Sequence, residues 1–237
     1  MFQDRQESYV SEDGLVSRQI FFDPDIYRKE LEQVYAKVWL FMGHESQIPN
    51  PGDYFTNYMG EDPVIVWRDR KGKVRVFLNS CRHRGMRISR TDFGNAKQFT
   101  CPFHGWSYSS EGSLVGVPFL EDAYFNDLDR EQWALYEIPK VQSYEGLIFA
   151  NMDPECISLN EFLGDLRWYL DIFLSRALGE IQVLPGRQRY TCKTNWKIAG
   201  ENFAGDTYHL PYSHGSLFRV DAPLLNPVSY MHSPNLY

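Results

Sequence analysis

Long apolar runs are missing from this sequence of 237 residues. The best candidate, Val38-Trp39-Leu40-Phe41-Met42, is far shorter than the roughly 20 residues that a transmembrane helix needs, so a membrane span is excluded. The first ten residues, MFQDRQESYV, lack the apolar core and the cleavage pattern of a secretory signal. The expected location is therefore the cytoplasm.

Positive charge and cysteine are also scarce. The 24 Lys and Arg are outnumbered by 31 Asp and Glu, and no block of basic residues stands out. Because contacts to phosphates need clustered cations, nucleic acid is not an expected partner. Four cysteines are too few for a disulfide framework in a chain of this length, so a cysteine that lies near a histidine is first a candidate metal ligand.

Aromatic residues, in contrast, make up 16 % of the chain, which indicates thick cores, large interfaces or an aromatic-lined pocket. Helical spacing of apolar residues covers 23–39, and short β-rich runs separated by turns follow from about 45 to 152. Helical spacing returns from 158 and can end at Gly179. We then expect a strand near 187–193 and a helix from 196 to 208 that stops or kinks before Pro211.

The first chemical motif consists of two short segments that each contain one cysteine and one histidine, Cys81-Arg82-His83 and Cys101-Pro102-Phe103-His104. If the strands between them form a hairpin, its tips bring four ligands to one centre. Two thiolates and two imidazoles also suit zinc, but zinc fingers usually pair Cys with Cys and His with His along the chain. Mixed segments are typical of a Rieske [2Fe–2S] centre, with two Cys on one iron and two His on the other. The pattern favours this cluster, and zinc is the alternative.

Residues around these ligands suit a buried cluster. Gly85 and Gly105 allow the backbone to approach and donate amide hydrogen bonds to the sulfurs. Trp106 is expected to cover one side of the cluster. Arg82 and Arg84 are either solvated surface cations or a docking patch for an acidic electron donor, and the sequence leaves both readings open.

The second motif lies in the stretch from Gly200 to His214 and contains Asp206, His209 and His214. Asp206 and His209 are three residues apart, so on one helix they share a face. A break at Pro211 lets His214 turn back towards His209, and the two imidazoles then bind one metal with Asp206 orienting His209. Two His and one carboxylate with open positions form the site of mononuclear non-haem Fe(II) oxygenases. His44 and His232 have no partner in either motif and are read as structural.

Taken together, C-x-H-x17-C-x-x-H, Asn-Trp-Lys and ENFAGDTYHLPYSH resemble the α (large) subunits of Rieske aromatic-ring-hydroxylating dioxygenases, over essentially the whole chain. The stretches HESQIP (44–49) and WYL (168–170) are most similar to the naphthalene, biphenyl and phenylpropionate dioxygenase type. The resemblance implies an α+β fold: an all-β Rieske domain at 45–157, then the incomplete start of a helix-on-antiparallel-sheet catalytic domain at 158–237. Residues 1–44 would be a helical segment of that catalytic domain.

The resemblance also implies roles for single residues. Cys81, His83, Cys101 and His104 would hold the cluster, and His209 and His214 would bind the catalytic iron. Asp206 would link a cluster-ligating histidine of one subunit to the iron site of its neighbour, and Asn202 and Phe203 would border iron and substrate. The family's third iron ligand is an Asp far downstream, and Asp221 follows His214 too closely to replace it. We therefore expect an N-terminal fragment or a truncated protein that is inactive as an oxygenase by itself.

The implied reaction is the insertion of both atoms of O2 into an aromatic ring, giving a cis-dihydrodiol in aromatic hydrocarbon catabolism. Its electrons come from NAD(P)H through a reductase, a ferredoxin, or both, and the implied assembly is a homotrimer with or without a small β subunit (α3β3). A Rieske monooxygenase or demethylase would use the same motifs. A pure Rieske electron carrier, with no need of a second metal site, and a zinc-stabilised binding module are the rivals from other classes. The aromatic substrate itself is not encoded in these motifs.

Overall fold

The computed structural model describes residues 9–176, 179, 181–186, 188–206 and 209–216. The chain forms two compact units, one of residues 28–186 and one of residues 1–27 with 187–237. Within the described residues no helix has both the length and the apolar character needed to cross a membrane. His232 and Asp221 lie outside the described residues.

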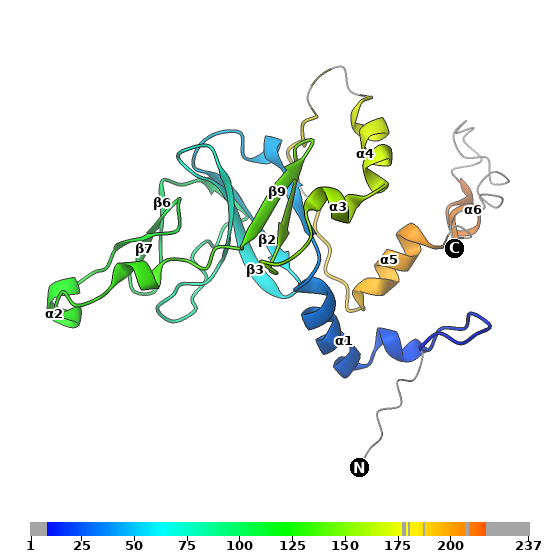
Figure 1. The fold of residues 1–237 in the computed structure, drawn as a ribbon, viewed down its shortest axis with the longest axis horizontal. Helices are drawn as coiled ribbons and strands as arrows, with labels where there is room; N and C mark the ends of the chain where they lie inside the picture. Colours follow the sequence, from blue (N-terminus) through cyan, green and yellow to red (C-terminus); the bar gives the residue numbers. More distant parts are fainter. Residues whose placement is uncertain (1–8, 177–178, 180, 187, 207–208, 217–237) are drawn as a thin grey trace, which may run out of the picture. The chain divides into compact units, whose positions relative to one another are not determined.

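In the described residues of the larger unit, ten β-strands form three antiparallel sheets. Figure 1 shows the arrangement of the strands. The first sheet has the order β1-β10-β9, the second β4-β3-β2-β5, and the third β6-β7-β8. The strands are β1 (Leu40–His44), β2 (Asp53–Met59), β3 (Asp62–Arg68), β4 (Val74–Leu78), β5 (Phe93–Asn95), β6 (Gln98–Thr100), β7 (Ser107–Ser109), β8 (Leu114–Gly116), β9 (Lys140–Tyr144) and β10 (Leu147–Asn151).

The helices of the described residues are short. They are η1 (Arg18–Phe21), α1 (Pro24–Glu30), η2 (Leu31–Tyr35), η3 (Glu45–Gln47), α2 (Leu120–Tyr124), η4 (Arg130–Trp133), α3 (Leu159–Leu163), α4 (Leu166–Leu174), α5 (Trp196–Ala204) and α6 (His209–Ser213). The expected β-rich region from about 45 to 152 is present, and within it β3 and β4 form a hairpin across Lys71-Gly72. No strand forms in the described part of 187–193, contrary to the sequence expectation.

The larger unit, called the β unit from here on, has three hydrophobic clusters in its described residues, of which the smallest joins Trp39, Phe149, Leu159 and Leu163. Apolar residues of β2, β3 and β4 that point to one face pack with Ile148 and Ala150 of β10. Residues on the other face, among them Trp67 and Phe77, pack with Tyr108 and with the two cysteines of the first motif. One face of the sheet formed by β2, β3 and β4 therefore packs against Cys81 and Cys101.

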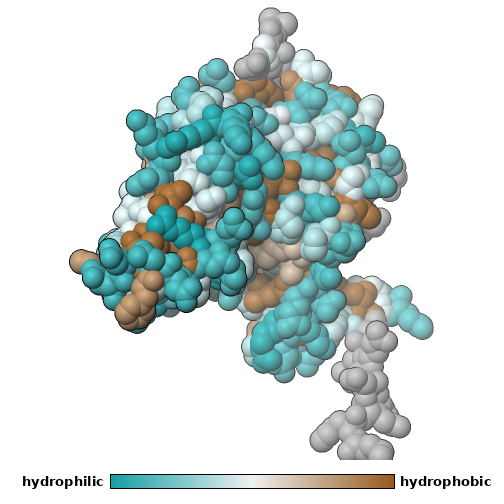
Figure 2. All heavy atoms as spheres, turned by 60° about the vertical axis from the view of Figure 1, so that its left-hand side comes forward, coloured by the Kyte–Doolittle hydropathy of each residue, from teal (hydrophilic) through white to brown (hydrophobic). Residues whose placement is uncertain are grey.

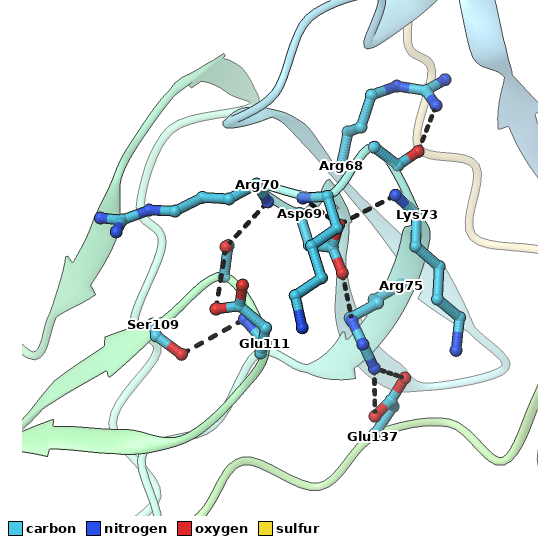
Figure 3. Close-up of polar contacts among 11 residues, drawn as sticks. Arg68, Asp69, Arg70, Lys73, Arg75, Ser109, Glu111 and Glu137 are labelled. Carbon is cyan, nitrogen blue, oxygen red and sulfur yellow. Dashed lines mark hydrogen bonds and ion pairs between the residues drawn. The ribbon is translucent and has the colours of Figure 1, made fainter.

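An ion pair between the buried Asp69 and Arg75 stabilises the turn end of the β3–β4 hairpin (Figure 3). Asp69 is fully buried, and its carboxylate accepts hydrogen bonds from the N–H groups of Lys71 and Lys73 and from the Arg75 guanidinium (2.8–2.9 Å). Arg75 also donates to Glu137 at 2.8 Å. Burial alone would raise the pKa of Asp69, but these hydrogen bonds hold it below its ordinary value of 3.8.

The helices depart from the expected pattern at glycine. The helix expected from 158 begins with a capping box between Ser158 and Glu161 but ends at Gly164, whose φ of +47° leaves the helical region. A separate helix, α4, follows. The helix expected from 196 to 208 likewise ends at Ala204, before Asp206.

Candidate metal centres

The two cysteine–histidine segments fold into two loops with the same backbone pattern. In each loop the cysteine N–H donates to the carbonyl five residues later, and the glycine N–H four residues later donates back to the cysteine carbonyl (2.7–2.9 Å). The pairs are Cys81 with Gly85 and Cys101 with Gly105. These bonds close both loops and fix the backbone that carries the two cysteines.

Both glycines are required by the backbone of these loops. Gly85 and Gly105 have a φ of +73°, in the left-handed region that residues with a Cβ rarely adopt. A Cβ on Gly105 would also lie 2.8 Å from Cγ of Pro118. Both glycines are therefore needed for the backbone turn, and Gly105 also allows Pro118 to pack closely.

The four expected ligands form two pairs, one of cysteines and one of histidines, and do not surround a single point. Cys81 and Cys101 are buried, with 3 % and 2 % of their surface exposed, and their thiols contact each other. The rings of His83 and His104 are neighbours, with centroids 4.7 Å apart, His83 being half-buried and His104 exposed. Among the described residues no three His, Cys, Asp or Glu surround one point as they would around a single ion.

One atom in this arrangement lacks a partner. Nδ1 of His83 is buried and makes no hydrogen bond, and it is the one such side-chain nitrogen or oxygen in the part of the chain that the structure describes. A buried imidazole nitrogen left unpaired is costly unless a ligand meets it. Two inner thiols and two outer imidazoles, one with an unpaired nitrogen, fit a [2Fe–2S] cluster with two Cys on one iron and two His on the other.

Tyr108, on β7, is a neighbour of this centre that sequence reasoning missed. Its hydroxyl is fully buried, accepts a hydrogen bond from the Arg82 N–H at 3.1 Å and lies 3.3 Å from Sγ of Cys81. Because the oxygen already accepts from Arg82, its own proton is directed to the sulfur. A buried tyrosine seven residues after the second cysteine is the signal that sequence reading could have used.

The local environment shifts the pKa of three groups. Burial raises the pKa of the Cys81 thiol, the neighbouring Cys101 raises it further, and hydrogen bonds from Tyr108 and the His83 N–H act in the opposite direction. Burial and the Cys81 contact raise the pKa of Tyr108, so its hydroxyl stays protonated. Burial and the nearby His104 lower the pKa of His83, which favours the neutral imidazole that a metal needs.

An aromatic wall lies behind His83. Trp106 is buried and stacks on the His83 ring, with centroids 4.9 Å apart and planes 10° apart. Trp133 meets Trp106 edge-on at 5.5 Å. The structure therefore places Trp106 beside a predicted ligand.

Arg82, which the sequence left as a surface cation or a docking residue, holds an internal contact instead. Its guanidinium donates to the carbonyls of Gln132 and Ala134 and lies 3.7 Å from the centroid of the Tyr136 ring. Arg84 is exposed. Of the two arginines, only Arg84 has the solvent exposure that the docking interpretation requires.

The second motif is built differently from the expected helix. Asp206 lies outside both helices, after the end of α5, and its carboxylate accepts the His209 N–H at 3.1 Å at the start of α6. The expectation that Asp206 and His209 share one helix face is wrong. Gly205 ends α5, and the short Asp206 side chain then caps the next helix.

Pro211 lies inside α6 rather than at a break. It is the third residue of His209–Ser213, the part of that helix that the structure describes. The helix α5 ends before it, with Gly205 as its C-cap and Asp206 outside the helix. His209 and His214 still come together, with ring centroids 5.4 Å apart.

The hydrogen bonding of His209 prepares one nitrogen for a metal. Its Nδ1 contacts the carbonyl oxygen of Asp206, which can only accept, so Nδ1 carries the proton and Nε2 of the neutral ring is a lone-pair donor. Oδ2 of Asp206 lies 3.8 Å from the same Nδ1. His209, His214 and the Asp206 backbone thus form a two-imidazole site with a defined tautomer at His209.

The remaining predicted residues have varied positions. Asn202 and Phe203 lie on α5, both exposed, Phe203 to 89 %. His44, read as structural, is buried and caps η3 by accepting the Ser46 N–H. Its ring leaves no room for a Cβ at Gly146.

Two family descriptions match consecutive parts of the chain. Residues 38–144 match the Rieske [2Fe-2S] domain, and residues 164–234 match the ring hydroxylating alpha subunit (catalytic domain). The first contains both cysteine–histidine loops, and the second contains Asp206, His209 and His214. A Rieske domain carries a [2Fe–2S] cluster, and the ring-hydroxylating alpha family carries a mononuclear iron.

Curated relatives agree with these matches. The benzene 1,2-dioxygenase subunit alpha of Pseudomonas putida is 48 % identical over 196 residues, which are 83 % of this chain and 43 % of that protein. The biphenyl 2,3-dioxygenase subunit alpha of Rhodococcus jostii is 49 % identical, over 83 % of this chain and 42 % of that protein. The chain thus spans less than half the length of these relatives.

Solved structures show the same fold. Naphthalene 1,2-dioxygenase from Rhodococcus sp. bound to indole has a TM-score of 0.82 and 45 % identity, covering 90 % of this chain and 48 % of that one. A quaternary ammonium Rieske monooxygenase has a TM-score of 0.71 and 26 % identity, covering 81 % of this chain and 51 % of that one. The expected fold class, an all-β Rieske domain followed by part of a catalytic domain, is confirmed.

Proposed function

Since the chain belongs to the family of Rieske aromatic-ring-hydroxylating dioxygenase α subunits, we propose that it acts in an oxygenase that inserts both atoms of O2 into an aromatic ring and yields a cis-dihydrodiol. The observation that carries this proposal is the pair of matched loops, with buried thiols inside and two imidazoles outside. The dioxygenase relatives, at 45–49 % identity, favour this reaction over the monooxygenase alternative, whose relative shares 26 %.

We assign the ligands as follows: Cys81 and Cys101 to one iron of the cluster, His83 and His104 to the other, and His209 and His214 to a mononuclear iron. When bound, the cluster would accept and release single electrons, and the Fe(II) would supply the centre at which O2 is reduced. Trp106, stacked on His83, would keep water from that side of the cluster. Tyr108 would donate a hydrogen bond to the sulfur of Cys81, which lies 3.3 Å from its hydroxyl oxygen.

The difference in exposure between the two histidines suggests which one passes electrons outward. His83 is half-buried and faces its own aromatic wall, whereas His104 is exposed. Of the two rings, the exposed one is the more accessible to a carboxylate from outside the β unit. We therefore assign His104 as the histidine that Asp206 of a neighbouring subunit contacts, and His209 of that neighbour as the next group along the route.

The partners follow from this assignment. Electrons would reach the cluster from NAD(P)H through a reductase, a ferredoxin, or both. A link between His104 of one subunit and Asp206 of the next is a head-to-tail contact, which closes into a ring such as a trimer, with or without a β subunit. Asn202 and Phe203, next to the iron ligands in sequence, would border iron and substrate.

An isotope experiment tests the reaction. The intact oxygenase, supplied with NAD(P)H and electron-transfer proteins, is given an aromatic hydrocarbon such as benzene or biphenyl under ¹⁸O2, and the product is analysed by mass spectrometry. The expected product is a dihydrodiol in which both oxygens are labelled and come from one O2 molecule, which a mixture of ¹⁶O2 and ¹⁸O2 shows. A product with one label, or a demethylated product, would support the monooxygenase alternative and contradict the proposal.

A further inference from the structure

Arg82 is an arginine whose side chain is bound inside its own unit. Hydrophilic residues are prominent on the face drawn in Figure 2, as expected for charged groups that remain in water. Arg82 departs from this pattern, because it is half-buried and its guanidinium donates to two backbone carbonyls. It also lies between Cys81 and His83 in the chain, so whatever holds Arg82 acts on the first cluster loop.

The guanidinium caps the C-terminal end of η4. Its Nε donates to the carbonyl oxygen of Ala134 at 3.0 Å, and its Nη2 donates to that of Gln132 at 3.2 Å. Carbonyls at the end of a helix have no partner within the helix, and a basic side chain can supply the missing donors. Trp133, the last residue of η4, lies between these two residues. The two hydrogen bonds therefore hold the backbone on both sides of Trp133.

A ring contact fixes the guanidinium from a second direction. Its central carbon lies 3.7 Å from the centroid of the Tyr136 ring and 5.7 Å from that of the Trp133 ring. Tyr136 is in turn attached to the sheet, because its carbonyl accepts the Leu78 N–H of β4 at 2.9 Å. A planar group that donates twice and also lies on an aromatic ring is a geometry that arginine provides and lysine does not.

Trp133 connects this anchor to an expected cluster ligand. Its ring meets Trp106 edge-on at 5.5 Å, and Trp106 stacks on His83 at 4.9 Å with planes 10° apart. Trp106 is buried, so its ring cannot turn unless its neighbours move. The stacked His83 ring carries the buried Nδ1 to which no described residue donates or accepts a hydrogen bond. The direction of that nitrogen therefore depends on Trp106, and the position of Trp106 depends on Trp133.

We propose that Arg82 is a positioning residue for the cluster. By capping η4 it holds Trp133 against Trp106, and these two rings set the plane of the His83 imidazole. The Arg82 N–H, which donates to the Tyr108 hydroxyl at 3.1 Å, ties the same residue to the core behind the loop. The inference rests on the proposed function, because it describes how the assigned cluster site orients one of its ligands.

Pulsed EPR of the reduced cluster, in the full chain labelled with ¹⁵N-histidine, tests this positioning. In Arg82→Met we expect one of the two histidine nitrogen couplings to shift and the other to keep its wild-type value, because the ring stacked on Trp106 is that of His83. Release of iron to a chelator should become about tenfold faster. Arg82→Lys should shift the same coupling, because lysine keeps the charge but not the planar fork.

A matched control separates this effect from the loss of a positive charge. Arg87 is an exposed arginine of the same loop, 5.5 Å from the centroid of the Tyr58 ring on β2. Arg87→Met therefore removes the same charge and a similar ring contact without touching η4. Both histidine couplings and the rate of iron release should keep their wild-type values in this variant.

A double variant tests whether Arg82 acts through Trp133. Trp133→Leu keeps the arginine and should shift the same coupling, so it tests the same step where Arg82→Met lowers the cluster content. The double variant Arg82→Met, Trp133→Leu should shift the coupling no further than the larger of the two single shifts, because the two residues act in series.

Four results would overturn the proposal. Wild-type couplings in Arg82→Met would show that the ring stack does not need the arginine, and wild-type couplings in Arg82→Lys would show that its charge is sufficient. Proportional shifts of both couplings would indicate a general loosening of the β unit. Additive shifts in the double variant would show that Arg82 acts by a route other than Trp133.

These results are distinguishable from a failure of the proposed function. Zinc in the wild-type protein would refute the cluster and the positioning together. A singly labelled product under ¹⁸O2 would refute the proposed reaction, while the EPR couplings would still decide the positioning. A wild-type cluster coupled to two histidine nitrogens, with the same couplings in every Arg82 and Trp133 variant, would refute the positioning alone.

Discussion

The two candidate metal sites differ in how much of each site the surrounding fold provides. In the β unit, Cys81 and Cys101 sit in closed loops against a packed sheet, and Tyr108 and Trp106 contact the ligands. In the other unit, His209 and His214 belong to one short helix and its end, and Asp206 is about half exposed. The β unit thus holds the expected cluster ligands in place by itself. At the expected iron site, the described contacts are the hydrogen bond that sets the tautomer of His209 and the bond from the His209 N–H to Asp206. The cluster should therefore tolerate disruption of the iron site, and its own properties should depend on local contacts.

The largest expected effect is loss of the cluster. Cys101→Ala removes one of two ligands from the inner iron, and we expect iron and labile sulfide to fall to background, with loss of visible absorbance. Cys156→Ala and Cys192→Ala are matched controls, because both cysteines are free and lie outside the two loops. A Cys101 variant that retained full cluster content would disprove the ligand assignment.

The next effect concerns the stability of the β unit. Asp69→Asn removes the buried carboxylate that pairs with the partly buried Arg75 and should lower the free energy of unfolding by about 3 kcal/mol in chemical denaturation. Glu137→Gln, at a half-exposed partner of the same arginine, should cost less than about 1 kcal/mol. Equal effects of the two substitutions would show that burial at Asp69 does not govern this network.

The same carboxylate predicts a pH dependence. The pKa of Asp69 is lower in the folded state than its ordinary value of 3.8, so its stabilising contribution is complete above that value and declines as the pH falls through the folded-state pKa. Acid should therefore destabilise the wild-type unit more than the Asp69→Asn variant below about pH 4. Parallel loss of stability in both proteins would contradict this interpretation.

A smaller effect is expected at the link between the two sites. In the intact oxygenase, Asp206→Asn should leave both metal sites occupied and slow electron transfer between them by roughly 10–100-fold in single-turnover experiments. Asparagine is as good a helix cap as aspartate, so α6 should persist, whereas Asp206→Ala should also weaken the helix. Wild-type transfer in the Asn variant would show that the role of Asp206 is limited to the cap.

The smallest effect sharpens the description of the cluster site. Tyr108→Phe removes a hydrogen bond to Cys81 that stabilises the more negative, reduced cluster, so the reduction potential should fall by on the order of 60 mV. Tyr54→Phe is the control, because the Tyr54 hydroxyl is bonded to Thr91 at 2.6 Å and not to a ligand. Equal potentials in wild type and Tyr108→Phe, measured by spectroelectrochemistry, would contradict the assignment.

Sequence reasoning succeeded where the signal was local. The β3–β4 hairpin and the pairing of one Cys with one His in each loop follow from residues that are near neighbours in the chain. It failed where the outcome depended on distant contacts. Tyr108 reaches Cys81 only through the core behind the sheet, and Arg82 is held by carbonyls about 50 residues away.

The boundaries of α5 and α6 also differ from those expected from the sequence. The sequence pattern predicts a helix break at Pro211, but Pro211 lies inside α6. Gly205 and Asp206, which end one helix and cap the next, carry the actual break. The polar capping signal at Asp206 was present in the sequence but was assigned to metal chemistry alone.

Metal analysis combined with spectroscopy of the reduced protein tests the central claim most directly. The purified chain should contain about two irons and two labile sulfides, with a potential in the broad Rieske range of roughly −150 to +300 mV. In protein labelled with ¹⁵N-histidine, pulsed EPR of the reduced cluster should detect two histidine nitrogens, both from His83 and His104. Stoichiometric zinc without visible absorbance, or a cluster coupled to no histidine nitrogen, would contradict the account.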